Sequence, residues 1–214
     1  KLTVFGQSIG SGKIKAHPDS GPGIGGGYNT AAGHFVVKGG TIDAEAGSEY
    51  NGGIGGGNGG GSGIRTISIY GGTVIADGGK CGAGIGKGRA NNVRETITIY
   101  GGVITARGGE YAAGIGGGEN RTNGNIEIWN GKVKAYGGKE AAGIGGGKNG
   151  NQRNPITIHG GYVYAHGGSS DTGGNAGAGI GGGDRGDGGE VTINGGTVKA
   201  FGGRIGAGIG GGAF

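Results

Sequence analysis

The sequence predicts an all-β protein that winds as a parallel β-helix, a solenoid of about seven rungs with three short strands per rung. Glycine supplies 69 of the 214 residues, and glycine disfavours helices. The tripeptide Gly-Ile-Gly recurs seven times at intervals of 29 to 36 residues. Between the copies, apolar and polar residues alternate as in half-buried strands. A repeat of this length buries its apolar side only when it stacks on its neighbours.

The first two strands of each rung are alternating runs joined by a two-residue turn, usually Gly-Gly. Residues 96–100 (Thr-Ile-Thr-Ile-Tyr) represent the first strand, and residues 73–77 (Thr-Val-Ile-Ala-Asp) represent the second. The isoleucines of the first run and Val74 and Ala76 of the second are expected to point inward. Stacked β-branched residues of this kind predict a dry aliphatic core.

The third strand of each rung is predicted at the Ala-Gly-Ile-Gly-Gly-Gly segment, with its central isoleucine pointing inward. The glycines on either side of that isoleucine are expected to face outward and to leave a wall without side chains. Glycine in a strand often marks the close approach of another backbone, which predicts a self-association face; a local steric reason is the alternative. This face comprises Gly23, Gly25, Gly53, Gly55, Gly84, Gly86, Gly114, Gly116, Gly143, Gly145, Gly179, Gly181, Gly208 and Gly210.

A column of aromatic residues follows the outward end of the first strands. It contains Tyr70, Tyr100, Trp129 and His159. Sugar rings stack on aromatic planes, so this column is a candidate glycan-binding strip. Stacking of like residues that stabilises the sheet is the alternative.

The second strands carry the most polar outward face. Asp43, Glu45 and Asp77 are expected within one rung of each other, with Arg107 and His17 beside them. Such a cluster could hold a cation such as Ca²⁺ or perform acid–base chemistry on a polysaccharide. A third interpretation of this cluster is that its charged side chains pair with one another between rungs.

The composition of the chain argues against several classes of partner. The net charge of +5 is spread too thinly to indicate nucleic acid. No apolar run approaches the roughly 20 residues that cross a bilayer, so no membrane insertion is expected. The single Cys81 excludes an internal disulfide framework. Arginines in the loops between rungs suggest either a basic ridge for acidic glycans or solvated charges: Arg65, Arg89, Arg94, Arg121, Arg153 and Arg185.

Residues 97–118 resemble the Gly-Ile-Gly-Gly-Gly repeats of bacterial cell-surface proteins, whose segments are described as pectate-lyase-like β-helices or carbohydrate-binding regions. The resemblance covers nearly the whole chain. It implies a right-handed coil and an extracellular or cell-surface location. It transfers no catalytic residue, because no lyase motif matches.

These observations together predict one β-helix repeat domain over residues 1–214, part of a longer chain or an assembly. We expect a non-enzymatic structural or adhesive module without a cofactor, which assembles into filaments through its glycine face and uncapped ends. Its expected partner is therefore itself. A carbohydrate-binding module that uses the aromatic column, and a polysaccharide lyase or hydrolase, are the alternatives.

Overall fold

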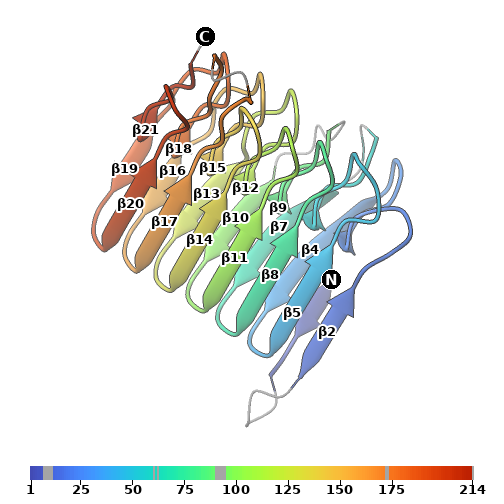
Figure 1. Cartoon of the computed structure of the whole chain (residues 1–214). Helices are drawn as coiled ribbons and strands as arrows, with labels where there is room; N and C mark the ends of the chain where they lie inside the picture. Colours follow the sequence, from blue (N-terminus) through green and yellow to red (C-terminus); the bar gives the residue numbers. More distant parts are fainter. Residues whose placement is uncertain (7–11, 60, 62, 90–94, 172–173, 214) are drawn as a thin grey trace.

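The chain forms a parallel β-solenoid of three sheets. The computed structural model describes residues 1–6, 12–59, 61, 63–89, 95–171 and 174–213. Each sheet contains seven strands, one from each rung, and Figure 1 shows the rungs stacked in sequence order. Within these described residues there is no helix that is long and apolar enough to cross a membrane. The predicted all-β parallel β-helix with three strands per rung is confirmed.

The three sheets take their strands in turn from every rung. The first sheet contains β1 (Leu2–Val4), β4 (Ala31–Val37), β7 (Gly63–Ile69), β10 (Thr96–Ile99), β13 (Asn125–Ile128), β16 (Ile156–Ile158) and β19 (Val191–Ile193). The second contains β2 (Lys13–Ala16), β5 (Thr41–Glu45), β8 (Thr73–Asp77), β11 (Val103–Arg107), β14 (Lys132–Tyr136), β17 (Tyr162–His166) and β20 (Thr197–Phe201). The third contains β3 (Ile24–Gly25), β6 (Ile54–Gly55), β9 (Ile85–Gly86), β12 (Ile115–Gly116), β15 (Ile144–Gly145), β18 (Ile180–Gly181) and β21 (Ile209–Gly210).

Parallel pairing keeps equivalent residues in register from rung to rung. Ile97 pairs with Ile67 on one side and with Ile126 on the other. The inward isoleucines, valines and alanines of the inner rungs form one buried cluster, as predicted. Burial of each isoleucine contributes about 2 kcal/mol, so the stack as a whole stabilises strands that are too short to persist alone.

The turn between the first and second strands depends on its second glycine. Gly72, Gly102 and Gly131 have φ values of 85°, 102° and 106°. This left-handed region is open to glycine without a steric penalty. The turn therefore reverses the chain within two residues and keeps the second strand close to the first.

The longest repeat interval contains an insertion that leaves the stack intact. An isolated antiparallel bridge joins Ser169 and Ala176. After this bridge the chain rejoins the rung, since the Gly177 amide donates a hydrogen bond to the Gly168 carbonyl oxygen at 2.9 Å. Ile180 then resumes its place beside Ile144.

Two neighbouring residues of β11 test the inward and outward assignment. Ile104 is fully buried, whereas Val103 is 47% exposed. We predict that Ile104→Ala lowers the free energy of unfolding by about 2–5 kcal/mol, because it leaves a cavity in the aliphatic stack. The matched control, Val103→Ala, should change it by less than about 0.5 kcal/mol. Denaturant unfolding followed by circular dichroism measures both, and equal losses would contradict the assignment.

Candidate functional site

In the inner rungs, the glycine just before the third strand lies against the main chain of the following rung. A Cβ atom on Gly84 would lie 2.7 Å from the main-chain nitrogen of Arg107, and one on Gly114 would lie 2.6 Å from that of Tyr136. Arg107 and Tyr136 end the second strands β11 and β14. These glycines are therefore needed at an internal corner, where the third strand approaches the end of the next second strand.

The glycine that ends each third strand is fixed by its backbone conformation. Gly86 has a φ of 136°, and a Cβ there would collide with the Gly116 carbonyl oxygen of the next rung. Gly116 has a φ of 131°, and a Cβ there would collide with Gly145 in the same way. Both the dihedral angle and the close contact exclude any larger residue.

The prediction that these glycines line an outer wall is wrong for the inner rungs. The third strands are only two residues long and include a left-handed residue, so the alternation rule for extended strands does not apply. The local steric alternative explains the glycines, and their association with a second copy stays a prediction. The buried positions are Gly53, Gly55, Gly84, Gly86, Gly114, Gly116, Gly143, Gly145, Gly179 and Gly181.

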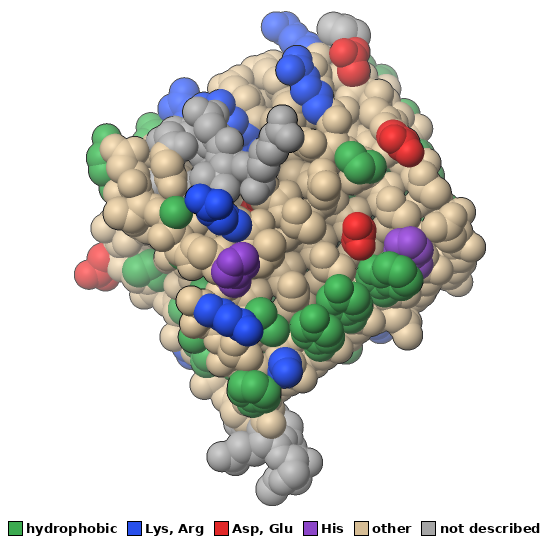
Figure 2. All heavy atoms as spheres, turned by 180° about the vertical axis from the view of Figure 1, so that it is seen from behind, with side chains coloured by type: hydrophobic (Ala, Val, Ile, Leu, Met, Phe, Trp, Pro, Cys, Tyr) green, Lys and Arg blue, Asp and Glu red, His purple; other side chains and the backbone are tan. Residues whose placement is uncertain are grey.

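The aromatic column forms a stacked ladder on the outside of the first sheet. Ring centroids are 4.5 Å apart for Tyr70 and Tyr100, 6.4 Å for Tyr100 and Trp129, and 3.8 Å for Trp129 and His159, with interplanar angles of 18° or less. The two tyrosines and Trp129 are 41% to 50% exposed, and Figure 2 shows a row of hydrophobic side chains that ends at a histidine. Because the rings cover each other's faces, mainly their edges meet solvent. This geometry favours the stabilising role; glycan binding by the ladder stays a prediction.

The polar cluster on the second sheet is engaged in side-chain contacts between rungs. His17 lies 3.3 Å from Asp43 and 3.5 Å from Glu45, and Arg107 lies 3.0 Å from Asp77. In the part of the chain that the structure describes, no three His, Cys, Asp or Glu side chains gather as metal ligands. The three carboxylates therefore do not form one ligand set, and the arrangement is that of charge pairing between rungs.

Sequence reasoning missed an aromatic patch on the outside of β14, β17 and β20. The patch consists of Tyr136, Tyr164, His166 and Phe201. Tyr164 lies 5.7 Å from Tyr136 and 5.4 Å from Phe201, with the rings tilted by 48° and 42°. The tilted rings of Tyr136 and Phe201 leave part of their faces open, whereas the rings of Tyr164 and His166 lie nearly parallel with centroids 6.4 Å apart. The signal was an aromatic ring or a histidine at the last position of three successive second strands, namely Tyr136, His166 and Phe201.

A pair of buried charged residues was also missed. Lys87 replaces a glycine of the repeat motif and is buried, and Glu95 is only 2% exposed. Neither carboxylate oxygen of Glu95 has a hydrogen-bond partner among the described residues. Burial raises the pKa of Glu95 to about 8, although the nearby Lys87 acts in the opposite direction. Burial likewise lowers the pKa of Lys87, and Glu95 partly offsets this.

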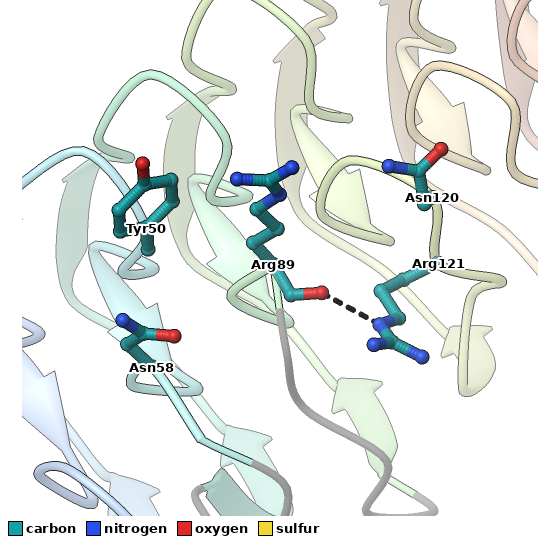
Figure 3. A pocket seen from close by; sticks show the side chains of 5 residues that line it. All are labelled: Tyr50, Asn58, Arg89, Asn120 and Arg121. Carbon is teal, nitrogen blue, oxygen red and sulfur yellow. Dashed lines mark hydrogen bonds between the residues drawn. The ribbon is translucent and has the colours of Figure 1, made fainter.

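Two of the loop arginines line a cavity of about 510 Å³. Arg89 and Arg121 share its wall with Tyr50, Asn58 and Asn120 (Figure 3). Arg94, another of the loop arginines, lies outside the described residues. Two residues of the predicted basic ridge thus line one concave site, with their guanidinium groups directed apart (Figure 3).

Comparison with known proteins gives a match to one family model, described as beta helix repeat. It matches residues 67–86, 97–119, 126–148, 156–184 and 191–213, which together make up more than half of the chain. The comparisons with curated proteins and with solved structures gave no match.

The buried Glu95 predicts a pH-dependent stability. Its pKa rises from 4.5 to about 8 on folding, so the folded state binds the proton more tightly. The stabilisation is complete below pH 4.5, declines as the pH rises, and is lost above pH 8, with a slope of at most about 1.4 kcal/mol per pH unit. Glu95→Gln should remove this decline in denaturant titrations from pH 5 to 9. The exposed Glu190→Gln should retain it; an identical pH profile for Glu95→Gln and the wild type would refute the assignment.

Proposed function

The chain belongs to the beta helix repeat family, and we propose from this premise that it is a non-enzymatic structural or adhesive solenoid of the cell exterior. In this proposal, copies associate end to end into filaments, and the partner of the chain is a second copy of itself. The stacked-rung fold supports the proposal, because a solenoid lengthens by adding rungs without changing its core.

The observation that carries the proposal is the in-register stacking of the described rungs, in which each rung pairs its inward residues with the same residues of the next. Ile158 pairs with Ile193, and Ile180 pairs with Ile209, so one aliphatic column passes from rung to rung. A rung of a second copy with the same residues would pair with β19, β20 and β21 as these strands pair with β16, β17 and β18. Strand edges with apolar side chains are templates for such pairing.

The first rung carries apolar residues at the same inward positions. Ile14 pairs with Ile42, and Ile24 pairs with Ile54. A copy stacked head to tail would continue all three sheets and the aliphatic columns. Such a heterologous contact does not close on itself, so it generates a filament and not a ring.

The glycine columns favour the same contact. Gly210 is only partly buried, whereas a Cβ on Gly181, one rung earlier, would collide with the Gly210 carbonyl. A following rung must therefore present glycine at this point, and the first rung does so at Gly25. The predicted self-association through glycines thus becomes an end contact and not a lateral one.

Assembly is tested by placing a charge on the end and on the side of the rod. Ile209→Asp should abolish association, because the carboxylate would be buried without a partner. Val103→Asp is the matched control, since Val103 is equally exposed but points sideways from β11; it should assemble like the wild type. Sedimentation velocity and electron microscopy measure the particles. A monodisperse 20.4 kDa species at every concentration of the wild type would overturn the proposal.

Carbohydrate binding is a second candidate function, and the aromatic patch favours it. Its tilted rings offer open faces, and Lys199 lies 5.8 Å from the Tyr162 ring beside it. None of the outward residues of β14, β17 and β20 is acidic. The third hypothesis, a polysaccharide lyase or hydrolase at Asp43, Glu45 and Asp77, has no comparable support, because contacts with His17 and Arg107 engage these side chains.

Two substitutions decide where a polysaccharide binds. Tyr164→Ala should weaken retention on immobilised polysaccharides about tenfold, because it removes an aromatic face on which a sugar ring would stack. Trp129→Ala, on the ladder, should leave retention unchanged. The reverse result would transfer the site to Tyr70, Tyr100, Trp129 and His159. No retention of the wild type on acidic or neutral polysaccharides would remove carbohydrate binding altogether.

A further inference from the structure

The two tyrosines of the aromatic ladder occupy equivalent places in adjacent rungs. Tyr70 follows β7 and Tyr100 follows β10, and these two strands pair in register as far as Ile69 and Ile99. The Tyr100 amide donates a hydrogen bond to the Ile69 carbonyl oxygen at 2.7 Å, which extends the parallel pairing to the tyrosines. Residues at equivalent positions of adjacent parallel strands direct their side chains to the same face. The two phenol rings therefore leave the sheet side by side.

The two phenol rings are stacked with their hydroxyl groups close together. Their centroids are 4.5 Å apart and their planes differ by 12°. Partial burial raises the pKa of the Tyr100 phenol, and the charge of Tyr70 and a hydrogen bond to Tyr70 raise it further. A hydrogen bond between two phenols requires that their oxygen atoms are neighbours. The ring carbons next to the two hydroxyl groups are therefore neighbours as well.

Both phenols of this pair are open to solvent. Tyr70 is 50% exposed and Tyr100 is 41% exposed, and Figure 2 shows a row of hydrophobic side chains on the surface of this face. Among the described residues, the other pair of tyrosines in ring contact is Tyr136 and Tyr164, with centroids 5.7 Å apart and planes tilted by 48°. These two positions are out of register, because Tyr136 pairs with His166. The second pair is therefore an internal comparison for the first.

We propose that Tyr70 and Tyr100 form a dityrosine cross-link between adjacent rungs when a peroxidase and hydrogen peroxide supply the oxidant. Each phenol gives up one electron and its hydroxyl proton and becomes a phenoxyl radical. The two radicals join through one carbon next to each hydroxyl group. The hydrogen on each of these carbons then moves to the phenol oxygen, which restores both aromatic rings. Hydrogen peroxide takes up the two electrons and two protons and leaves as two water molecules.

The cross-link joins β7 to β10 outside the aliphatic core. Tyr70 and Tyr100 are 30 positions apart in the chain, so the link closes a loop that contains one complete rung. A covalent link of this kind restricts the unfolded chain and stabilises the folded state, by the same argument that applies to a disulfide. The site lies within one chain, and it therefore does not depend on the head-to-tail assembly proposed above.

Oxidation of the dilute purified protein with a peroxidase and hydrogen peroxide tests the proposal. We expect dityrosine fluorescence from a chain that still migrates as a 20.4 kDa monomer. Mass spectrometry should find one linked pair of peptides that contains Tyr70 and Tyr100 and has lost two hydrogen atoms. The linked chain should also unfold at a higher urea concentration. Absence of dityrosine, its presence only in dimers and larger species, or oxidation of Trp129 without a cross-link would overturn the proposal.

Conservative variants locate the bond. Tyr70→Phe and Tyr100→Phe each remove one exposed hydroxyl group, so both should keep the circular dichroism spectrum of the wild type and lose nearly all of the dityrosine in the monomer. Tyr164→Phe, the matched control from the tilted pair, should give the yield of the wild type. A cross-link that persists in Tyr100→Phe, or that disappears in Tyr164→Phe, would refute the assignment.

Discussion

The close approach of main chain to main chain at the third corner of each rung is the constraint on which the whole stack depends. At this corner a two-residue strand crosses the end of the next second strand, and a Cβ atom does not fit. Glycine in a strand costs stability because it loses more conformational freedom than other residues. Regular hydrogen bonds between rungs offset that cost: the Ile115 amide donates to Gly143 at 3.0 Å, and the Gly117 amide donates to Gly145 at 2.8 Å. The high glycine content therefore follows from the geometry of the coil.

Because the rungs pair in register, outward side chains at equivalent positions also lie one above another and form ladders. Rungs lie about 4.8 Å apart, which places aromatic rings on aromatic rings and charges beside charges. In one such ladder the charges of the side chains alternate in sign. Lys80 lies 3.8 Å from Glu110, and Lys139 lies 3.5 Å from Glu110 and 2.6 Å from Asp171. Exposed ion pairs contribute little free energy, whereas the buried isoleucines contribute most of it. The core thus determines stability, and the surface ladders discriminate against pairings shifted by one rung.

The sequence was sufficient for the strands, the core and the columns, because the alternation of period two and the nearly constant repeat interval specify both side and register. It correctly placed Ile97 in the core and His17 beside Glu45. It failed for the glycines, because the rule of alternate faces assumes extended backbone and the φ of Gly86 is 136°. It also failed for the arginine cavity. That cavity is formed by turns of three rungs, and no periodicity specifies how turn side chains are oriented.

In a solenoid, residues that depart from the repeat are the ones available for a specific chemical role, because the residues at regular positions are needed for packing between rungs. Lys87 is such a departure, a buried cation in place of a glycine of the motif. Burial lowers its pKa, Glu95 opposes this, and Arg121 adds repulsion that lowers it further. A buried charge is costly unless something compensates it, and Glu95 is itself desolvated. The repulsion between Lys87 and Arg121, which belong to adjacent rungs, therefore adds to the unfavourable free energy of burying Lys87.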